Sequence, residues 1–135
     1  MATEGLGKVL IDTSAWIDFF RKKGPTFSAV AKLLEERRIC SAGLIVAELM
    51  QGVKSEKELS VIREFSSVFD FFPETLQTWE QAGELSFAMR KKGVTIGLSD
   101  CYIAILAHDN DVLLLTLDAH FKLIQKEIAI SLFIP

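Results

Sequence analysis

The stretch Lys8-Val9-Leu10-Ile11-Asp12-Thr13-Ser14 constrains the fold most, because a short apolar run ends abruptly at a carboxylate and two hydroxyl groups. Such a run predicts a strand, from about Lys8 to Asp12, that is buried on both faces as in a parallel sheet. In α/β folds, ligands bind at the carboxyl ends of the parallel strands. Asp12 is therefore a candidate functional residue. The alternative is that Asp12, Thr13 or Ser14 only caps the helix that follows.

The rest of the chain alternates between helical and strand patterns. Further strands are expected at residues 39–42, 68–72, 112–116 and 128–130. Helices are expected at residues 14–20, from a cap at Thr26, at 44–51, after Ser55, from Thr75 or Thr78 to about 92, from a cap at Ser99 to 108, and at 118–125. Alternation of this kind implies an α/β fold with a parallel sheet of four or five strands. Outward winding from the first strand, and a return beside it, predicts the strand order 3-2-1-4-5.

Composition limits the class of protein. A chain of 135 residues suits a single domain spanning residues 1–135. Cys40 and Cys101 lack any metal-ligand spacing, so we expect reduced thiols in a cytoplasmic protein. The net charge of -3 argues against adhesion to nucleic acid through bulk basic charge. If four acids hold a metal, however, the other residues together have a net charge of +1. The acidic net charge therefore does not exclude an RNA substrate.

Three later acids can join Asp12. Asp118 follows the strand at 112–116, Asp100 stands at the start of a helix, and Glu48 interrupts an apolar helical face. Carboxylates that converge repel one another, and a bound cation resolves that cost. A cluster of oxygen ligands without His or Cys suits Mg²⁺ or Mn²⁺ rather than zinc. The alternatives are that Asp100 and Asp118 are helix caps, and that Glu48 pairs with a basic residue such as Lys54.

The order and setting of these acids resemble the PIN-domain nucleases, and most closely the VapC-type toxin ribonucleases of toxin–antitoxin pairs. The resemblance covers nearly the whole chain. It is carried by four motifs, Val9-Leu10-Ile11-Asp12-Thr13-Ser14, Ala47-Glu48-Leu49 with Gly52, Asp100-Cys101-Tyr102-Ile103-Ala104, and Leu115-Thr116-Leu117-Asp118-Ala119-His120-Phe121. Leu117, where the family often has a polar residue, and Cys101, a less usual neighbour of the third acid, depart from the pattern, but neither removes a ligand.

The resemblance implies a PIN-like three-layer α/β/α nuclease domain, with Asp12, Glu48, Asp100 and Asp118 as catalytic metal-binding acids. Ser14 and Thr116 would orient these carboxylates. The implied activity is Mg²⁺- or Mn²⁺-dependent hydrolysis of RNA phosphodiester bonds, with a cognate antitoxin protein as inhibitor. We also expect a homodimer, because the stretch from Leu44 to Phe65 is rich in apolar side chains. The basic run Arg21-Lys22-Lys23 follows the helix that leads away from Asp12, and is a candidate contact for RNA phosphates.

Other functions and roles remain open at this stage. A haloacid-dehalogenase-like phosphatase would need an acid at the position of Ser14, and a receiver domain would need a phosphoacceptor Asp after its third strand, where Pro73 and Glu74 stand. A PIN-like module that binds RNA or protein without cleaving it is the main alternative. His120 either touches a phosphate or is a polar surface residue. His108 is expected to be a solvated residue near a helix end.

Overall fold

The computed structural model describes residues 7–135, which form an α/β structure around a five-stranded sheet. The strands are β1 (Val9–Ile11), β2 (Ile39–Ser41), β3 (Asp70–Phe71), β4 (Leu113–Leu115) and β5 (Ser131–Leu132). Within the described residues, the strand pairings are all parallel, and the order is β3-β2-β1-β4-β5. The predicted fold class and strand order are confirmed.

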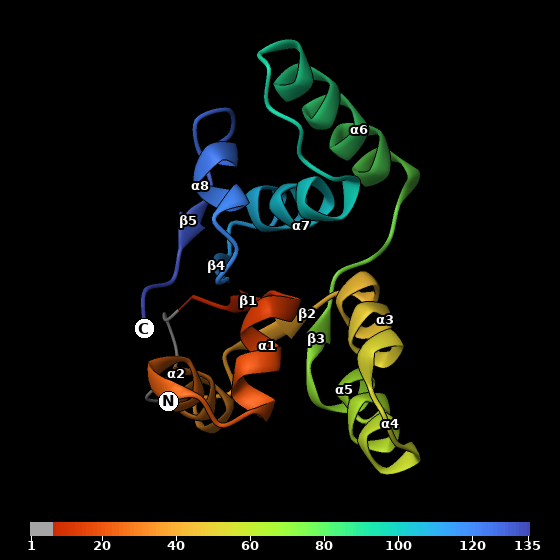
Figure 1. Cartoon of the computed structure of the whole chain (residues 1–135), viewed down its shortest axis with the longest axis vertical. Coiled ribbons are helices and arrows are strands. Elements are labelled where there is room, and N and C mark those ends of the chain that lie inside the picture. The colour runs from red at the N-terminus through yellow and green to blue at the C-terminus, as the bar shows by residue number, and fades with distance from the viewer. Residues whose placement is uncertain (1–6) are drawn as a thin grey trace.

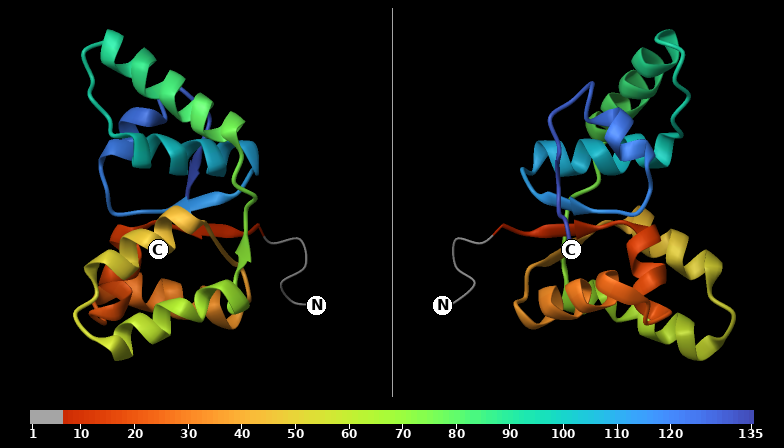
Figure 2. Two further views of the ribbon diagram at one scale, coloured as in Figure 1. Left: turned by 90° about the vertical axis from the view of Figure 1, so that its right-hand side faces the viewer. Right: turned by 60° about the vertical axis from the view of Figure 1, so that its left-hand side comes forward.

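Helices connect the strands and cover both faces of the sheet. They are α1 (Thr13–Phe20), α2 (Gly24–Glu35), α3 (Gly43–Gly52), α4 (Glu56–Arg63), α5 (Phe65–Val68), α6 (Leu76–Lys91), α7 (Leu98–Asp109) and α8 (His120–Ile124). In Figure 1, α6, α7 and α8 lie on one side of the strands, and α1 and α2 lie on the other. Figure 2 shows the same three layers from two further directions, with α3, α4 and α5 beside α1. Within the described residues, no helix has the length and apolar character needed to span a bilayer.

The two central strands owe their position to uninterrupted apolar sequence. Val9, Leu10 and Ile11 are fully buried, and so are Leu114 and Leu115 of β4. Strands covered by helices on both faces require side chains of this kind at every position. Between β1 and β4 the chain changes its direction of winding, which makes their carboxyl ends the natural ligand site of the sheet.

Helix α7 is the most buried helix, and it carries Asp100. All seven residues from Cys101 to Ala107 are buried, as expected for a helix that is apolar on every side. It packs against α6 and α8, and Tyr102 stacks on Trp79 of α6 with ring centroids 3.9 Å apart. The first turn of α7 is thereby fixed in position relative to the sheet.

Several expectations about element boundaries are wrong. Residues 128–130 are not a strand, since β5 begins at Ser131. Val68 belongs to α5, and β3 pairs only through residues 70–71, because Phe65 and Phe69 turn onto the Trp16 ring. Thr26 does not cap α2 and Ser99 does not cap α7, since these helices begin after Lys23 and Gly97.

Candidate metal centre

Asp12 lies directly after β1, where the sheet itself fixes its backbone. Its main-chain N–H donates to the carbonyl of Leu115 at 2.9 Å, so β1 and β4 are still paired at this residue. The Asp12 side chain is only 6% exposed. A carboxylate held this deeply at the switch point needs polar partners, because an unpaired buried charge is costly.

Two hydroxyl groups supply those partners. The Oγ of Ser14 donates to Asp12 Oδ2 at 3.0 Å, and the Oγ1 of Thr116 donates to the same oxygen at 2.9 Å. Each hydroxyl also accepts a main-chain N–H, Ser14 from Leu117 and Thr116 from Asp118, both at 3.0 Å. The two hydroxyl oxygens also lie 3.3 Å from each other. Ser14, Thr116 and Asp12 therefore form one hydrogen-bonded group, and the main-chain bonds fix the two hydroxyl groups in place.

Glu48 reaches the same region from α3. Its Oε1 accepts a hydrogen bond of 2.9 Å from the Oγ1 of Thr13, the first residue of α1. The alternative that Glu48 pairs with Lys54 is wrong, because no ion pair between these two side chains occurs within residues 7–135. The main-chain N–H of Lys54 donates to Glu58 at 3.4 Å. Thr13 thus determines the direction in which Glu48 points.

Asp100 and Asp118 meet at His120. The Nδ1 of His120 lies 3.1 Å from Asp100 Oδ2 and 3.3 Å from Asp118 Oδ1. The main-chain N–H of His120 also donates to Asp118 Oδ1 at 2.9 Å. One ligand atom from each of the three residues lies within 4.8 Å of the other two.

None of the three Asp side chains caps a helix from its N-cap position, since the N-cap of α8 is Ala119. Asp12 has the N-cap position of α1, but its side chain makes no cap hydrogen bond and is used by Ser14 and Thr116. Asp100 lies inside the first turn of α7, after the N-cap Gly97, and its carboxylate bonds His120. Asp118 does accept a main-chain N–H at the entry of α8, so part of its side chain has a structural use.

The four carboxylates influence one another electrostatically. Burial raises the pKa of Glu48, the Thr13 hydrogen bond opposes this, and the charges of Asp12 and Asp100 raise it further. Burial likewise raises the pKa of Asp100, against the hydrogen bond from His120, and the charges of Asp118 and Asp12 add to the rise. For His120, the hydrogen bond to Asp100 and the charge of Asp118 raise the pKa. Side chains from three separate helices and two strand ends therefore share one local field.

The donor set fits a hard divalent cation. Four carboxylates supply oxygen ligands, and their mutual repulsion favours a bound positive charge. Asp12 Oδ2 is already used by two hydroxyl groups, whereas Oδ1 has no hydrogen-bond partner within residues 7–135. Cys101 is buried beside Asp100 on α7, and burial raises the pKa of its thiol, so the thiolate form that binds metal is disfavoured.

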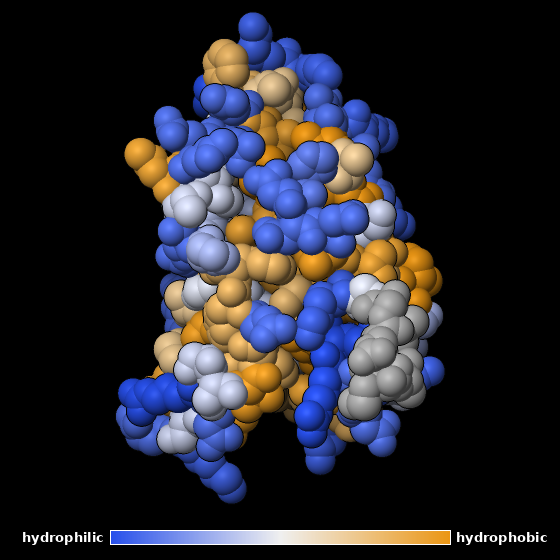
Figure 3. Space-filling model, turned by 180° about the vertical axis from the view of Figure 1, so that it is seen from behind, coloured by the Kyte–Doolittle hydropathy of each residue, from blue (hydrophilic) through white to orange (hydrophobic). Residues whose placement is uncertain are grey.

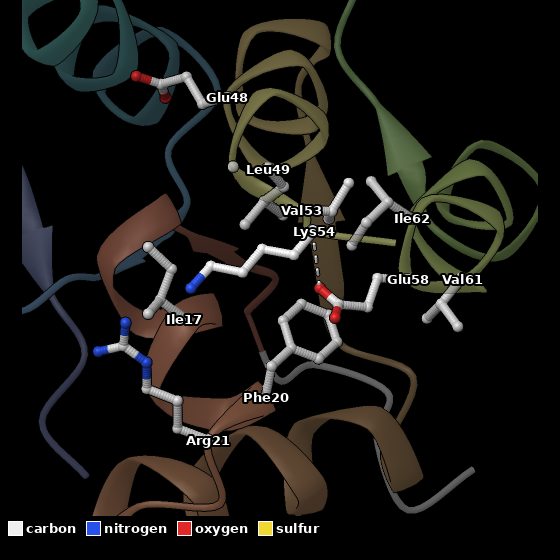
Figure 4. Close-up of a pocket in the computed structure, with 11 residues that line it drawn as sticks. Ile17, Phe20, Arg21, Glu48, Leu49, Val53, Lys54, Glu58, Val61 and Ile62 are labelled. Atoms are coloured by element: carbon white, nitrogen blue, oxygen red, sulfur yellow. Dashed lines mark hydrogen bonds between the residues drawn. The ribbon is translucent and has the colours of Figure 1, made fainter. Parts of the chain in front are cut away.

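A groove of about 500 Å³ begins at Glu48 and runs between α1, α3 and α4. Its walls are largely apolar and include Ile17, Leu49, Val53 and Ile62, although charged side chains also line it. Figure 4 shows the Lys54 side chain extending across the groove toward Ile17, with the Arg21 guanidinium on the same side. Lys22 and Lys23 are exposed after α1 and do not line the groove.

The PIN domain family model matches residues 9–127, which include all four acids. The chain belongs to the PIN domain family. This confirms the family that the four sequence motifs predicted.

Among curated proteins, the chain is similar to Ribonuclease VapC11 of Mycobacterium tuberculosis, with 28% identity over 123 residues, covering 87% of this chain and 92% of that protein. VapC ribonuclease Mb1587 of Mycobacterium bovis matches over the same extent. Among solved structures, DNA-bound VapBC from Salmonella typhimurium matches 95% of this chain and 98% of its own, with 22% identity and a TM-score of 0.74. VapBC2 from Rickettsia felis, bound to a promoter DNA fragment, matches 93% and 96%, with 22% identity and a TM-score of 0.71. The structural matches show that the fold is shared.

Two polar contributors were not assigned to the site from sequence. From sequence, Thr13 is a candidate helix cap, whereas in the structure its hydroxyl bonds Glu48. The sequence leaves His120 open as a phosphate contact or a surface residue, and in the structure its ring contacts Asp100 and Asp118. Thr13 is 35 positions from Glu48, and His120 is 20 positions from Asp100, so no local motif reveals these two contacts.

Proposed function

We propose that this PIN-domain chain is an endoribonuclease that requires Mg²⁺ or Mn²⁺, and that it is the toxin of a toxin–antitoxin pair. The observation that best supports the proposal is that the charges of Asp12, Asp100 and Asp118 act on Glu48 or Asp100, beside the carboxyl ends of β1 and β4. The relatives named VapC ribonucleases, at 28% identity over most of the chain, support RNA as the substrate. Cytoplasmic action would agree with the RNA substrate and with the buried free thiols of Cys40 and Cys101.

In this proposal the four carboxylates hold the cation directly or through water. What a divalent cation supplies in such a site is an activated water and stabilisation of the charge on the scissile phosphate. Ser14 and Thr116 keep Asp12 pointed into the site, and Thr13 does the same for Glu48. Such supporting hydrogen bonds commonly change metal affinity or activity by about 10–100-fold when they are removed. Arg21, Lys22 and Lys23 are proposed to bind RNA phosphates beside the acids.

Cleavage of single-stranded RNA by antitoxin-free protein tests the activity. We expect products with Mg²⁺ or Mn²⁺, none with a chelator, and a loss of at least about 100-fold in rate for Asp100→Asn. Asp109→Asn is the matched control, because this exposed Asp at the other end of α7 lies outside the acidic site. Equal cleavage in all samples would show a contaminant or another mechanism. Binding without cleavage of any RNA would favour the non-catalytic module.

The partner of the proposed toxin is a small antitoxin protein. Neighbours of this fold were solved as VapBC assemblies and as FitAcB from Neisseria gonorrhoeae. We propose that the antitoxin covers the apolar groove between α1, α3 and α4, which has Glu48 at one end. A protein seated there would bury aliphatic side chains and close the approach to the acids.

We also propose that the chain forms a homodimer. Apolar side chains reach the surface at several places on the face seen in Figure 3. Exposed large side chains include Leu76, Phe87 and Leu98 on α6 and α7. Light scattering over a concentration series is expected to give twice the chain mass of 15.1 kDa at micromolar concentration. A strictly monomeric mass at high micromolar concentration would contradict the dimer.

A further inference from the structure

The His120 ring lies between two of the proposed metal ligands. Its Nδ1 is 3.1 Å from Asp100 Oδ2 and 3.3 Å from Asp118 Oδ1. The main-chain N–H of the same residue holds Asp118 Oδ1 at 2.9 Å. One oxygen of each carboxylate is therefore already engaged by His120, and a cation that uses these oxygens must compete with the ring.

The chemistry of the imidazole nitrogen restricts how this competition can end. A ring nitrogen that donates a hydrogen bond has no lone pair for a metal. With Nδ1–H directed at carboxylate oxygens, that nitrogen holds the acids but does not bind a cation. The ring either leaves the two oxygens when the cation arrives, or loses its proton and becomes a ligand itself.

Two observations favour departure of the ring. The His120 side chain is 51% exposed, so moving it outward breaks little packing. The carboxylates around it offer only oxygen, and hard cations such as Mg²⁺ prefer oxygen to imidazole. Among residues 7–135, His120 is also the one side chain that bonds Asp100.

We propose that His120 is a positioning residue that holds Asp100 and Asp118 together in the metal-free protein, and that a divalent cation displaces its ring from them. This inference rests on the metal site of the proposed function. The His120 ring would therefore act before the metal binds. Removing the ring should therefore weaken the metal-free fold and at the same time improve metal affinity.

Calorimetric titration with Mn²⁺, together with thermal melts in chelator and in saturating Mn²⁺, tests the proposal on the native chain and on His120→Ala. We expect His120→Ala to bind Mn²⁺ about 3–10-fold more tightly, the scale of the net contribution of one ordinary hydrogen bond. Its Tm should fall in chelator and approach the native Tm in saturating Mn²⁺. His120→Asn, whose amide can donate near the position of Nδ1, should recover part of the Tm in chelator.

His108→Ala is the control, because this exposed histidine bonds the carbonyl of Ala129, far along α7 from the acids. It should leave the Mn²⁺ affinity unchanged. An affinity that falls in His120→Ala, with a larger Tm deficit in Mn²⁺ than in chelator, would make His120 a ligand and overturn the proposal. Unchanged affinity and Tm would make it a surface residue and would also overturn it. If the native chain binds no Mn²⁺, the metal site of the proposed function fails, and this inference fails with it.

Discussion

Glu48 shows how single side chains of the site are placed under electrostatic strain. Burial and the charges of Asp12 and Asp100 raise its pKa, while Thr13 provides its one hydrogen bond among the described residues. The folded metal-free protein therefore favours the neutral form of Glu48 more than the unfolded chain does. The charge that binds metal costs stability when the metal is absent.

Glu48→Gln keeps the acceptor for Thr13 and removes the charge. Because the folded-state pKa is raised, the favourable contribution of protonated Glu48 is fully present below the ordinary glutamate range and is lost as the pH rises through the raised value. At pH 7.5 in chelator we expect Glu48→Gln to be more stable than the native chain by about 0.5–2 kcal/mol, near the lower end because Glu48 is partly exposed. The gain should shrink toward pH 4.

Urea unfolding at pH 4, 6 and 7.5 measures this difference. Glu84→Gln, on α6 away from the acids, should show no such gain. A native chain that is more stable than Glu48→Gln at pH 7.5 in chelator would mean that Glu48 is stabilised by its surroundings, contrary to the shared-site account.

At the residue scale, sequence could predict the acids but not their supports. Asp12 and Asp118 end apolar runs, and Asp100 and Glu48 interrupt helical patterns, so each was recognisable locally. Ser14 and Thr116 followed from the motifs, and both bond Asp12. Thr13 and His120 could not be assigned, because their hydroxyl and imidazole acquire partners only when α1 meets α3 and α7 meets α8.

At the scale of elements, most helices and strands could be predicted from periodicity and turn residues. The last strand was misplaced for a specific reason. The carbonyls of Ala129 and Ile130 are taken by the side chains of His108 and Gln125, so pairing with β4 starts only at Ser131. Side-chain bonds to the backbone of this kind compete with strand pairing and leave no periodic signal in sequence.

Helices α1, α3 and α4 also define the surface proposed for the antitoxin. Val61 is 46% exposed and lines the groove, whereas Val68 is 64% exposed on α5 and does not. We expect Val61→Glu to weaken the complex with the antitoxin by at least about tenfold, since a charge would be buried in the apolar groove beneath the bound antitoxin. Val68→Glu is the matched control and should bind normally.

Co-expression with a candidate antitoxin, followed by affinity measurement on the purified partners, gives the comparison. The Tm of Val61→Glu, measured with and without metal, should match that of the native chain. A match would show that the substitution affects antitoxin binding and not the acidic site. Equal affinity of the native chain and Val61→Glu would place the antitoxin on another surface.

At the scale of the whole molecule, the strand order was predictable because buried strands, connected by helices, can wind in few ways. The burial of β1 and β4 brings Asp12 and Thr116 together across the switch point, 104 positions apart in the chain. The shape of the groove could not be predicted from sequence, because it forms where three helices diverge. The apolar character of the stretch from Leu44 to Phe65 did indicate that α3 and α4 present apolar side chains there.

The central claim is that Asp12, Glu48, Asp100 and Asp118 form one metal centre, and the Tm change on adding Mg²⁺ tests it most directly. Mass action should stabilise the native chain by about 2.7 kcal/mol at a Mg²⁺ concentration a hundredfold above the dissociation constant. We expect Mg²⁺ to raise the Tm clearly for the native chain and for Asp109→Asn. The rise should be much smaller for Asp12→Asn, Glu48→Gln, Asp100→Asn and Asp118→Asn. No rise in the native chain, or the same rise in all six proteins, would contradict it.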